Sequence, residues 1–344
     1  MIKGKRLNSE TIMVVIIFLF AYMMPLWVNP YQINIYTYFM TTILLCLSLS
    51  LIWGMTGIFS FAQATFFGIG AYAYGILGRL MENPSITILI MVLAVLLAAL
   101  AAGILGFFMF YGGVNDVFVG LITLCFAIAF HTFMMQTAGP EWSIKGIELG
   151  GWNGLYQIPK LTIFGLQMND IVYYLFVLSI VLFIYLGMKK IQKTKIGYSM
   201  LAVRENRSRS ELLGFNVPAV QTLVFAVGGG IAGLAGVLYS SWGTYVSPSN
   251  ITIAASTLPV VLVAAGGRKN STASMIFAGI YCVFTNQLAV STTGSQFSSI
   301  IIGVLLIIVI LYLPEGLIYS LFKSLDYLVG KMSAPKTSDK KEVF

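Results

Sequence analysis

Long apolar runs, broken by short polar segments, recur along the whole chain. Ten of these runs are long enough to form membrane-crossing helices, since one crossing takes about 20 apolar residues. Their interiors carry no charge and lack the strict alternation of a barrel strand, so the pattern predicts helices. The predicted spans cover residues 11–28, 35–53, 57–78, 86–111, 115–136, 170–188, 222–242, 251–267, 274–290 and 298–314.

Composition points to the same class of protein. The 344 residues are 58% hydrophobic and 9% charged, whereas a soluble domain is about 45–50% apolar and about 25% charged. Cys46, Cys125 and Cys282 lie far apart in apolar runs and predict neither a disulfide framework nor a metal cluster. We therefore expect an all-α polytopic membrane protein with ten transmembrane helices.

The basic residues predict how the helices are oriented. If the N terminus is cytoplasmic and the spans alternate, all 20 lysines and arginines lie inside except Arg79, Lys145 and Lys160. An excess of Lys and Arg in cytoplasmic loops sets membrane topology. Both the N and C termini are therefore predicted to be cytoplasmic. The net charge of +8 then reflects topology beside membrane lipid, and no nucleic-acid partner is expected.

The spans predict one transmembrane domain over residues 1–330. Residues 137–169 form a long loop on the outside, rich in Gly and Trp, and we expect it to be structured. Residues 189–221 form a long cytoplasmic loop with seven basic residues. The tail at 331–344 has no apolar period and is expected to be disordered.

The cytoplasmic loop is predicted to contain an amphipathic helix from Ser199 to Leu213. Its charged positions include Arg204, Glu205 and Arg207, with Leu212 among the apolar ones. Gly214 follows and is expected to end the helix, since glycine adopts positive φ without steric cost.

Several kinds of chemistry lack their residues in this sequence. His131 is the only histidine, no span holds two acidic residues, and no GxxxxGK[ST] motif occurs. We therefore expect no metal site, no cofactor, no enzyme activity and no nucleotide bound by a P-loop. Energy for transport would have to come from a separate subunit.

Neutral polar residues inside the spans are the candidates for a substrate path. Ser60 and Gln63 stand one helical turn apart and are predicted to share a face; Thr65, Thr123 and His131 complete the set. Such hydroxyls also serve as packing contacts between helices, worth about 0.6 kcal/mol each. Gln63 is favoured for the path because an amide needs more partners than one hydroxyl supplies. His131 is interpreted first as a structural histidine with satisfied hydrogen bonds.

Small residues predict where helices approach closely. Gly228, Gly229, Gly230, Gly233 and Gly236 open one span at helical spacing. Such spacing allows two helix backbones to come together.

Segments spread over residues 40 to 320 resemble one transporter family. The third span, TGIFSFAQATFFGIGAY, and the loop GYSMLAVRENRSRSELLGFNVPAVQ are similar to the branched-chain amino acid permease family of bacterial ABC importers. GGWNGL, YVSPSNIT, AAGGRKNS and LPEGL match further segments of that family in order. LIWG, and the basic residue after the glycines of GGRKNS, are also similar to urea and short-amide permeases of the same superfamily.

The resemblance implies a type II importer fold in the bacterial inner membrane. It implies a second, similar permease subunit, two ATP-binding subunits and an external solute-binding protein, with branched-chain amino acids as the first substrate class. The family's coupling helix corresponds to Val203–Phe215 here. The implied ATPase-coupling residues are Arg204, Glu205, Asn206, Arg207, Glu211, Leu212 and Gly214.

Three other functions stay open on the residues alone. A passive solute channel needs no cytoplasmic coupling helix. An intramembrane enzyme is opposed by the missing acid pairs and histidines, and an ion-coupled carrier remains possible if backbone carbonyls bind sodium.

Overall fold

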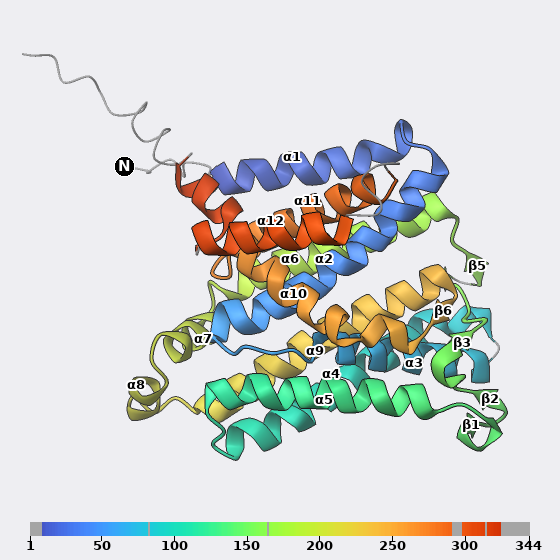
Figure 1. Ribbon diagram of the computed structural model, residues 1–344, viewed down its shortest axis with the longest axis horizontal. Helices are drawn as coiled ribbons and strands as arrows, with labels where there is room; N and C mark the ends of the chain where they lie inside the picture. The colour runs from blue at the N-terminus through green and yellow to red at the C-terminus, as the bar shows by residue number, and fades with distance from the viewer. Residues whose placement is uncertain (1–8, 82, 164, 291–297, 314, 325–344) are drawn as a thin grey trace, which may run out of the picture.

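The computed structural model describes residues 9–81, 83–163, 165–290, 298–313 and 315–324, and the structural statements below concern these residues (Figure 1). The predicted tail at 331–344 lies outside them. The α-helices are α1 (Ser9–Met23), α2 (Pro30–Thr56), α3 (Gln63–Met81), α4 (Thr87–Tyr111), α5 (Asp116–Gln136), α6 (Asp170–Ile191), α7 (Lys195–Glu205), α8 (Arg207–Leu212), α9 (Val217–Gly243), α10 (Ile253–Gly266), α11 (Ser271–Val290) and α12 (Ser298–Tyr312).

Short 3-10 helices and strands occupy the connections. The 3-10 helices are η1 (Met24–Leu26), η2 (Pro84–Ile86), η3 (Pro140–Trp142), η4 (Gly151–Asn153) and η5 (Pro248–Ile251). The strands are β1 (Ser143–Ile144), β2 (Ile147–Glu148), β3 (Leu155–Tyr156), β4 (Thr162–Ile163), β5 (Leu166–Gln167) and β6 (Tyr245–Val246).

Six helical stretches of the described residues are long and apolar enough to cross a membrane: Pro30–Thr56, Pro84–Tyr111, Asp116–Gln136, Asp170–Ile191, Val217–Gly243 and Ser271–Val290. Each of the ten predicted spans overlaps a helix. The third overlaps least well, because residues 57–62 are not helical and α3 begins only at Gln63.

Figure 1 shows the long helices side by side, with the strands gathered at one end of the molecule and α7 and α8 at the other. At the strand end, β3 pairs antiparallel with β6, so that Leu155 lies opposite Val246. The connection between α5 and α6 is thereby attached to the end of α9.

Helix α9 forms the centre of the packing against α2, α3 and α4. A Cβ atom on Gly236 would come within 1.9 Å of the Phe67 carbonyl oxygen, and one on Gly70 within 2.3 Å of the Gly233 carbonyl oxygen. The backbones of α3 and α9 therefore touch at positions that only glycine allows. This confirms the close approach predicted for the glycine-rich span.

Helix α4 meets α9 through a stripe of small residues. Ala94, Ala98 and Ala102 recur every four positions and are fully buried, and a Cβ on Gly229 would lie 2.2 Å from the Ala102 Cβ. The opposite face of α4 exposes large apolar side chains such as Leu96 and Leu100. Such a face fits a surface that meets lipid or another subunit.

Candidate functional site

The connection from α2 to α3 turns back into the helix bundle. Gly57 ends α2 with φ +80°, and residues 57–62 then run without helical structure to Gln63. Ser48 Oγ donates to Gln63 Oε1 at 2.9 Å. Ser48 precedes the last residue of α2 by about two turns, which places Gln63 about 12 Å inward from that end.

Non-helical backbone at such a depth is tolerated only where protein or a cavity surrounds it. Here the surroundings are α2 and α5. The Phe61 N–H donates to Thr123 Oγ1 of α5 at 3.1 Å, and a Cβ on Gly120 would lie 3.1 Å from the Phe59 ring. Ser60, Ala62 and Gln63 are fully buried.

The prediction that Ser60 and Gln63 share a helix face is wrong. Ser60 lies in the non-helical segment, where its Oγ accepts the Ala62 N–H at 3.2 Å. This local bond satisfies an amide just before the helix begins. Ser60 is nevertheless close to Gln63 in the chain, and Thr123 is joined to the same segment through Phe61.

We use the name α3 polar cluster for Ser48, Ser60, Gln63, Thr65 and Thr123. Gln63 Nε2 and Thr65 Oγ1 are buried and have no hydrogen-bond partner among the described residues. Buried polar atoms normally have one. Both atoms belong to the first turn of α3, where unpaired N–H groups and the helix dipole favour negative charge. The cluster therefore offers donors to a polar solute.

His131 stands apart from this cluster. It lies on α5, eight residues beyond Thr123, and its side chain is partly exposed. Within the described part of the chain its ring makes no hydrogen bond, and the structural role expected for it stays a prediction.

The cytoplasmic loop forms two helices where one was predicted. Asn206 interrupts the predicted helix with φ −161° and ψ 106°, and its Oδ1 accepts the Arg209 N–H at 2.8 Å. An Asn at this position is a favourable N-cap, and the sequence therefore carried a signal for the break. Gly214 follows α8 with φ +83°, which is the conformation expected for it.

Arg204 and Arg207 both bond to other parts of this chain, and their role in docking an ATPase stays a prediction. Arg204 Nη1 donates to the Gly54 carbonyl oxygen at 2.6 Å, and Arg207 Nη1 lies 3.4 Å from the Val114 oxygen and 3.8 Å from Asp116 Oδ1. The sequence did not predict Gly54 and Val114 as partners of the arginines. Both accept through a backbone carbonyl oxygen, which every residue type has.

Acidic side chains next to these arginines form ion pairs with them. Arg204 Nη2 lies 2.9 Å from Glu205 Oε1, and Arg207 Nε lies 3.2 Å from Glu211 Oε1. The hydrogen bond and charge of Arg204 lower the pKa of Glu205. Glu205 and Glu211 are therefore paired with arginines of the same chain.

Two apolar side chains at the end of α8 are exposed on the surface. Leu212 is 90% exposed and Leu213 is 70% exposed. Exposed leucines next to one another at a loop end are a feature of contact surfaces.

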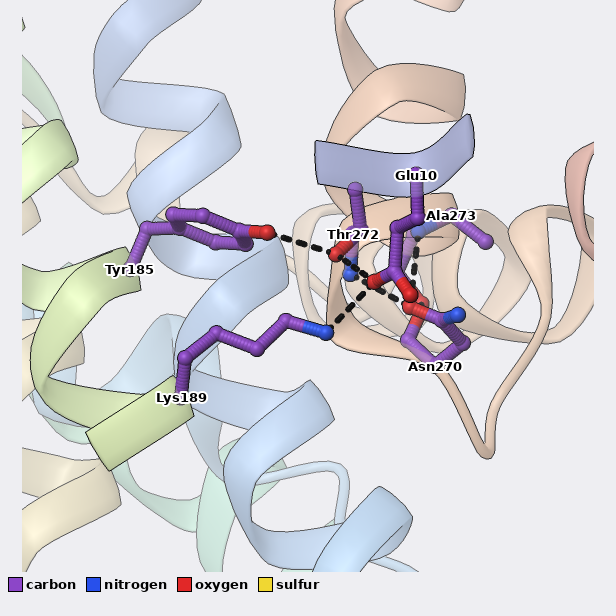
Figure 2. A network of polar contacts seen from close by, with 7 residues as sticks. Glu10, Tyr185, Lys189, Asn270, Thr272 and Ala273 are labelled. Atoms are coloured by element: carbon purple, nitrogen blue, oxygen red, sulfur yellow. Dashed lines mark hydrogen bonds and ion pairs between the residues drawn. The ribbon is translucent and has the colours of Figure 1, made fainter. Parts of the chain in front are cut away.

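A second polar network at the same end of the molecule ties α1 to α6 and α11 (Figure 2). The carboxylate of Glu10 receives hydrogen bonds from Lys189 Nζ at 2.5 Å and from Thr272 Oγ1. Tyr185 hydroxyl lies 2.8 Å from Thr272 Oγ1. Asn270 Oδ1 accepts the Thr272 N–H at 2.9 Å, which caps α11. The network joins segments that are far apart in the chain.

Comparison with known proteins gives a consistent family. The chain is 25% identical to the high-affinity branched-chain amino acid transport system permease protein LivM of Escherichia coli (strain K12), over 92% of this chain and 76% of that protein. It is 24% identical to a probable branched-chain amino acid transport permease protein LivM of Methanocaldococcus jannaschii, over 79% of this chain and 88% of that protein. It is 23% identical to the permease protein LivH of Salmonella typhimurium, over 81% and 91%.

No solved structure matches the chain. The family model described as "Branched-chain amino acid transport system / permease component" matches residues 31–310. Together with the six helical stretches of the described residues that are able to cross a membrane, this match identifies a multi-pass membrane protein and a transport subunit. The chain belongs to the family of permease components of branched-chain amino acid transport systems.

Proposed function

We propose that this chain is one permease subunit of an ATP-driven importer that moves branched-chain amino acids into the cytoplasm. Two permease subunits, usually similar but not identical, would work with two ATP-binding subunits and an external solute-binding protein. The names of the relatives, which include both LivM and LivH permeases, support a transporter of several components.

The observation that carries this proposal is the pair of exposed leucines at the end of α8, Leu212 and Leu213. Leu212 and Leu213 lie on a segment whose arginines are already bonded inside the chain. The full sequence has no P-loop motif, so energy must enter through contact with another protein. Solvent-exposed leucines at a fixed place on the molecule suit an apolar recess in an ATP-binding subunit.

The proposed topology has ten spans with both termini in the cytoplasm. The arrangement of the helices supports it, since α7, α8 and the Glu10 network lie at one end and the strands at the other (Figure 1). The first end carries Lys189 and the basic residues of α7 and α8, in agreement with the distribution of positive charge in cytoplasmic loops. In a bacterium the membrane would be the inner one.

The proposed substrate is a small solute with no net charge. A zwitterionic amino acid suits a path without charged side chains, and its carboxylate can accept hydrogen bonds from the first turn of α3 near Gln63 and Thr65. The relatives' names favour branched-chain amino acids. Urea or a short amide is the alternative, on the similarity of LIWG and GGRKNS noted above.

Co-purification tests the proposal through α8. The double change Leu212→Glu, Leu213→Glu should reduce recovery of the ATP-binding subunit with the tagged permease about thirtyfold, as expected when apolar anchors worth about 2 kcal/mol are lost from an interface. Leu166→Glu, on β5 at the opposite end and 77% exposed, is the matched control. Equal recovery from both variants would contradict the proposal.

Uptake measurements separate the substrates. Membrane vesicles that contain the complete transporter should accumulate labelled leucine or valine in an ATP-dependent manner. Accumulation of labelled urea or acetamide in place of the amino acids would assign the alternative class, and uptake without ATP would indicate a passive channel.

A further inference from the structure

The two inward-pointing arginines hold the two helices between which residues 57–62 run. Arg204 bonds to Gly54 in the last turn of α2. Arg207 contacts Val114 and Asp116 at the start of α5. The α7–α8 segment (residues 195–212) is therefore attached to both helices at the same end of the molecule.

The same two helices hold residues 57–62 deeper in the bundle. Ser48 of α2 bonds to Gln63, and Thr123 of α5 bonds to the Phe61 N–H. Ser48 lies about 9 Å from Gly54 along α2, and Thr123 lies about 10 Å from Asp116 along α5. A helix of this length moves as a rigid body, so a displacement at the arginine end shifts the inner bonds as well.

Arg204 also touches the non-helical segment directly. A Cβ placed on Gly57 would lie 3.2 Å from Arg204 Cγ, so the arginine side chain lies against the first residue after α2. Its aliphatic carbons cover this residue while its guanidinium bonds to Gly54. Arg204 thus restrains both the end of the helix and the start of the segment.

There is room beside this contact for the segment to move. A cavity of about 220 Å³ lies next to it, lined by Trp53, Gly54, Gly57, Arg204, Glu205, Arg268 and Lys269. This cavity gives the Arg204 side chain space to move.

We propose that Arg204 and Arg207 are positioning residues that transmit movement of the α7–α8 segment to residues 57–62, and so control the exposure of the α3 polar cluster. The inference rests on the proposed function, because the movement comes from the ATP-binding subunit. It assigns the two arginines to transmission within the permease, while contact with the ATP-binding subunit belongs to Leu212 and Leu213.

The test compares transport with ATP hydrolysis in the complete transporter, reconstituted in lipid vesicles with its binding protein. Arg204→Gln and Arg207→Gln should each retain the ATP-binding subunit at wild-type yield. The number of solute molecules moved per ATP should fall about tenfold, within the usual size of a coupling between two sites.

Two further variants separate transmission from a general loss of charge. Arg204→Lys keeps one donor for the Gly54 oxygen and should restore most of the ratio. Arg209→Gln removes the same charge from α8, and in the described structure the Arg209 side chain forms no hydrogen bond or ion pair. Its ratio should equal that of the wild type. A normal ratio in Arg204→Gln, or an equal loss in Arg209→Gln, would overturn the inference.

Chemical labelling of a cysteine in residues 57–62 measures directly how accessible this segment is. Ser60→Cys is placed in a chain whose Cys46, Cys125 and Cys282 are replaced by alanine. In this background the reaction of Cys with a maleimide should change when ATP is added. Arg204→Gln should abolish that change, whereas an unaltered change would contradict the inference.

The hydrogen bond from the Phe61 N–H to Thr123 provides a second test, which can be carried out even if the Arg204→Gln variant does not assemble. Thr123→Val removes the acceptor for the Phe61 N–H and should also lower the transport ratio; an unchanged ratio would overturn the inference. If both variants assemble, their combined effect should be smaller than the product of the separate effects, since both release the same segment.

The outcomes distinguish this inference from the proposed function. If no ATP-binding subunit is recovered with the wild-type chain, the proposed function fails. If the wild type transports with ATP and Arg204→Gln does so equally well, only the role of the arginines fails.

Discussion

Lys189 Nζ lies 2.5 Å from Glu10 Oε1, although the two residues are 179 positions apart in the chain. Their side chains are 28% and 24% exposed, so the ion pair is largely shielded from water. Thr272 donates to the same carboxylate oxygen. Glu10 therefore attaches the start of α1 to both α6 and α11 (Figure 2).

The first prediction concerns this attachment. Glu10→Gln removes the charge opposite Lys189 and should lower the free energy of unfolding by about 1.5–3 kcal/mol, the value of hydrogen bonds to charged groups. Thermal denaturation of the purified permease measures the change. Glu315→Gln is the control, because its pair with Lys323 is 58% and 71% exposed and should contribute little. An equal loss in both variants would mean that shielding of the Glu10 pair is irrelevant.

The second prediction concerns helix contact at glycine. Gly236→Ala places a Cβ 1.9 Å from the Phe67 carbonyl oxygen, and α3 and α9 must move apart to accept it. We expect a loss of about 1–3 kcal/mol, typical of overpacking. Gly187→Ala on α6 has no atom within 4 Å of the new Cβ, and it should be neutral or stabilising by up to about 1 kcal/mol. Thermal denaturation measures the stability of the two variants. Equal stability would contradict the close packing of α3 against α9 at Gly236.

The third prediction concerns the α3 polar cluster. Gln63→Leu deletes the unpaired Nε2 and the acceptor for Ser48. Ser48 keeps its bond to the Leu45 oxygen, so stability should change by only about 0.6 kcal/mol. Uptake should fall about tenfold, as for a loss of about 1.4 kcal/mol of interaction with the solute. Gln136→Leu, at the exposed end of α5, serves as the control. Normal uptake by Gln63→Leu would assign this residue to packing.

The fourth prediction concerns topology. Reporters fused after residue 150 should be external, and reporters after residues 205, 270 and 335 should be cytoplasmic. The reason is the concentration of Lys and Arg in the segments placed inside. Alkaline phosphatase and fluorescent-protein fusions give opposite readings on the two sides. A cytoplasmic reading at 150 would refute the proposed alternation.

Sequence pattern was sufficient for most of the helices and for the close contact between α3 and α9. Apolar runs and their polar breaks predict helices because length and hydrophobicity are local properties of the chain. The glycines of α9 also indicated close packing through a local pattern. Small residues at helical spacing allow two helix backbones to approach each other closely. The family was visible in short motifs such as LPEGL, and the match over residues 31–310 confirms it.

Tertiary structure decided where α3 begins and what the arginines do. The apolar run continues through residues 57–62, so its pattern predicts helix there, but the chain must turn back between α2 and α5 and does so without helical structure. Arg204 carries the same charge wherever it points, and only the position of α2 directs it to the Gly54 oxygen, 150 residues earlier. A residue's type determines which bonds it can form, whereas the acceptor it reaches depends on packing between segments remote in sequence. Most of the helices therefore follow from the sequence alone, whereas the start of α3 and the connection from α8 to the polar cluster follow from their assembly.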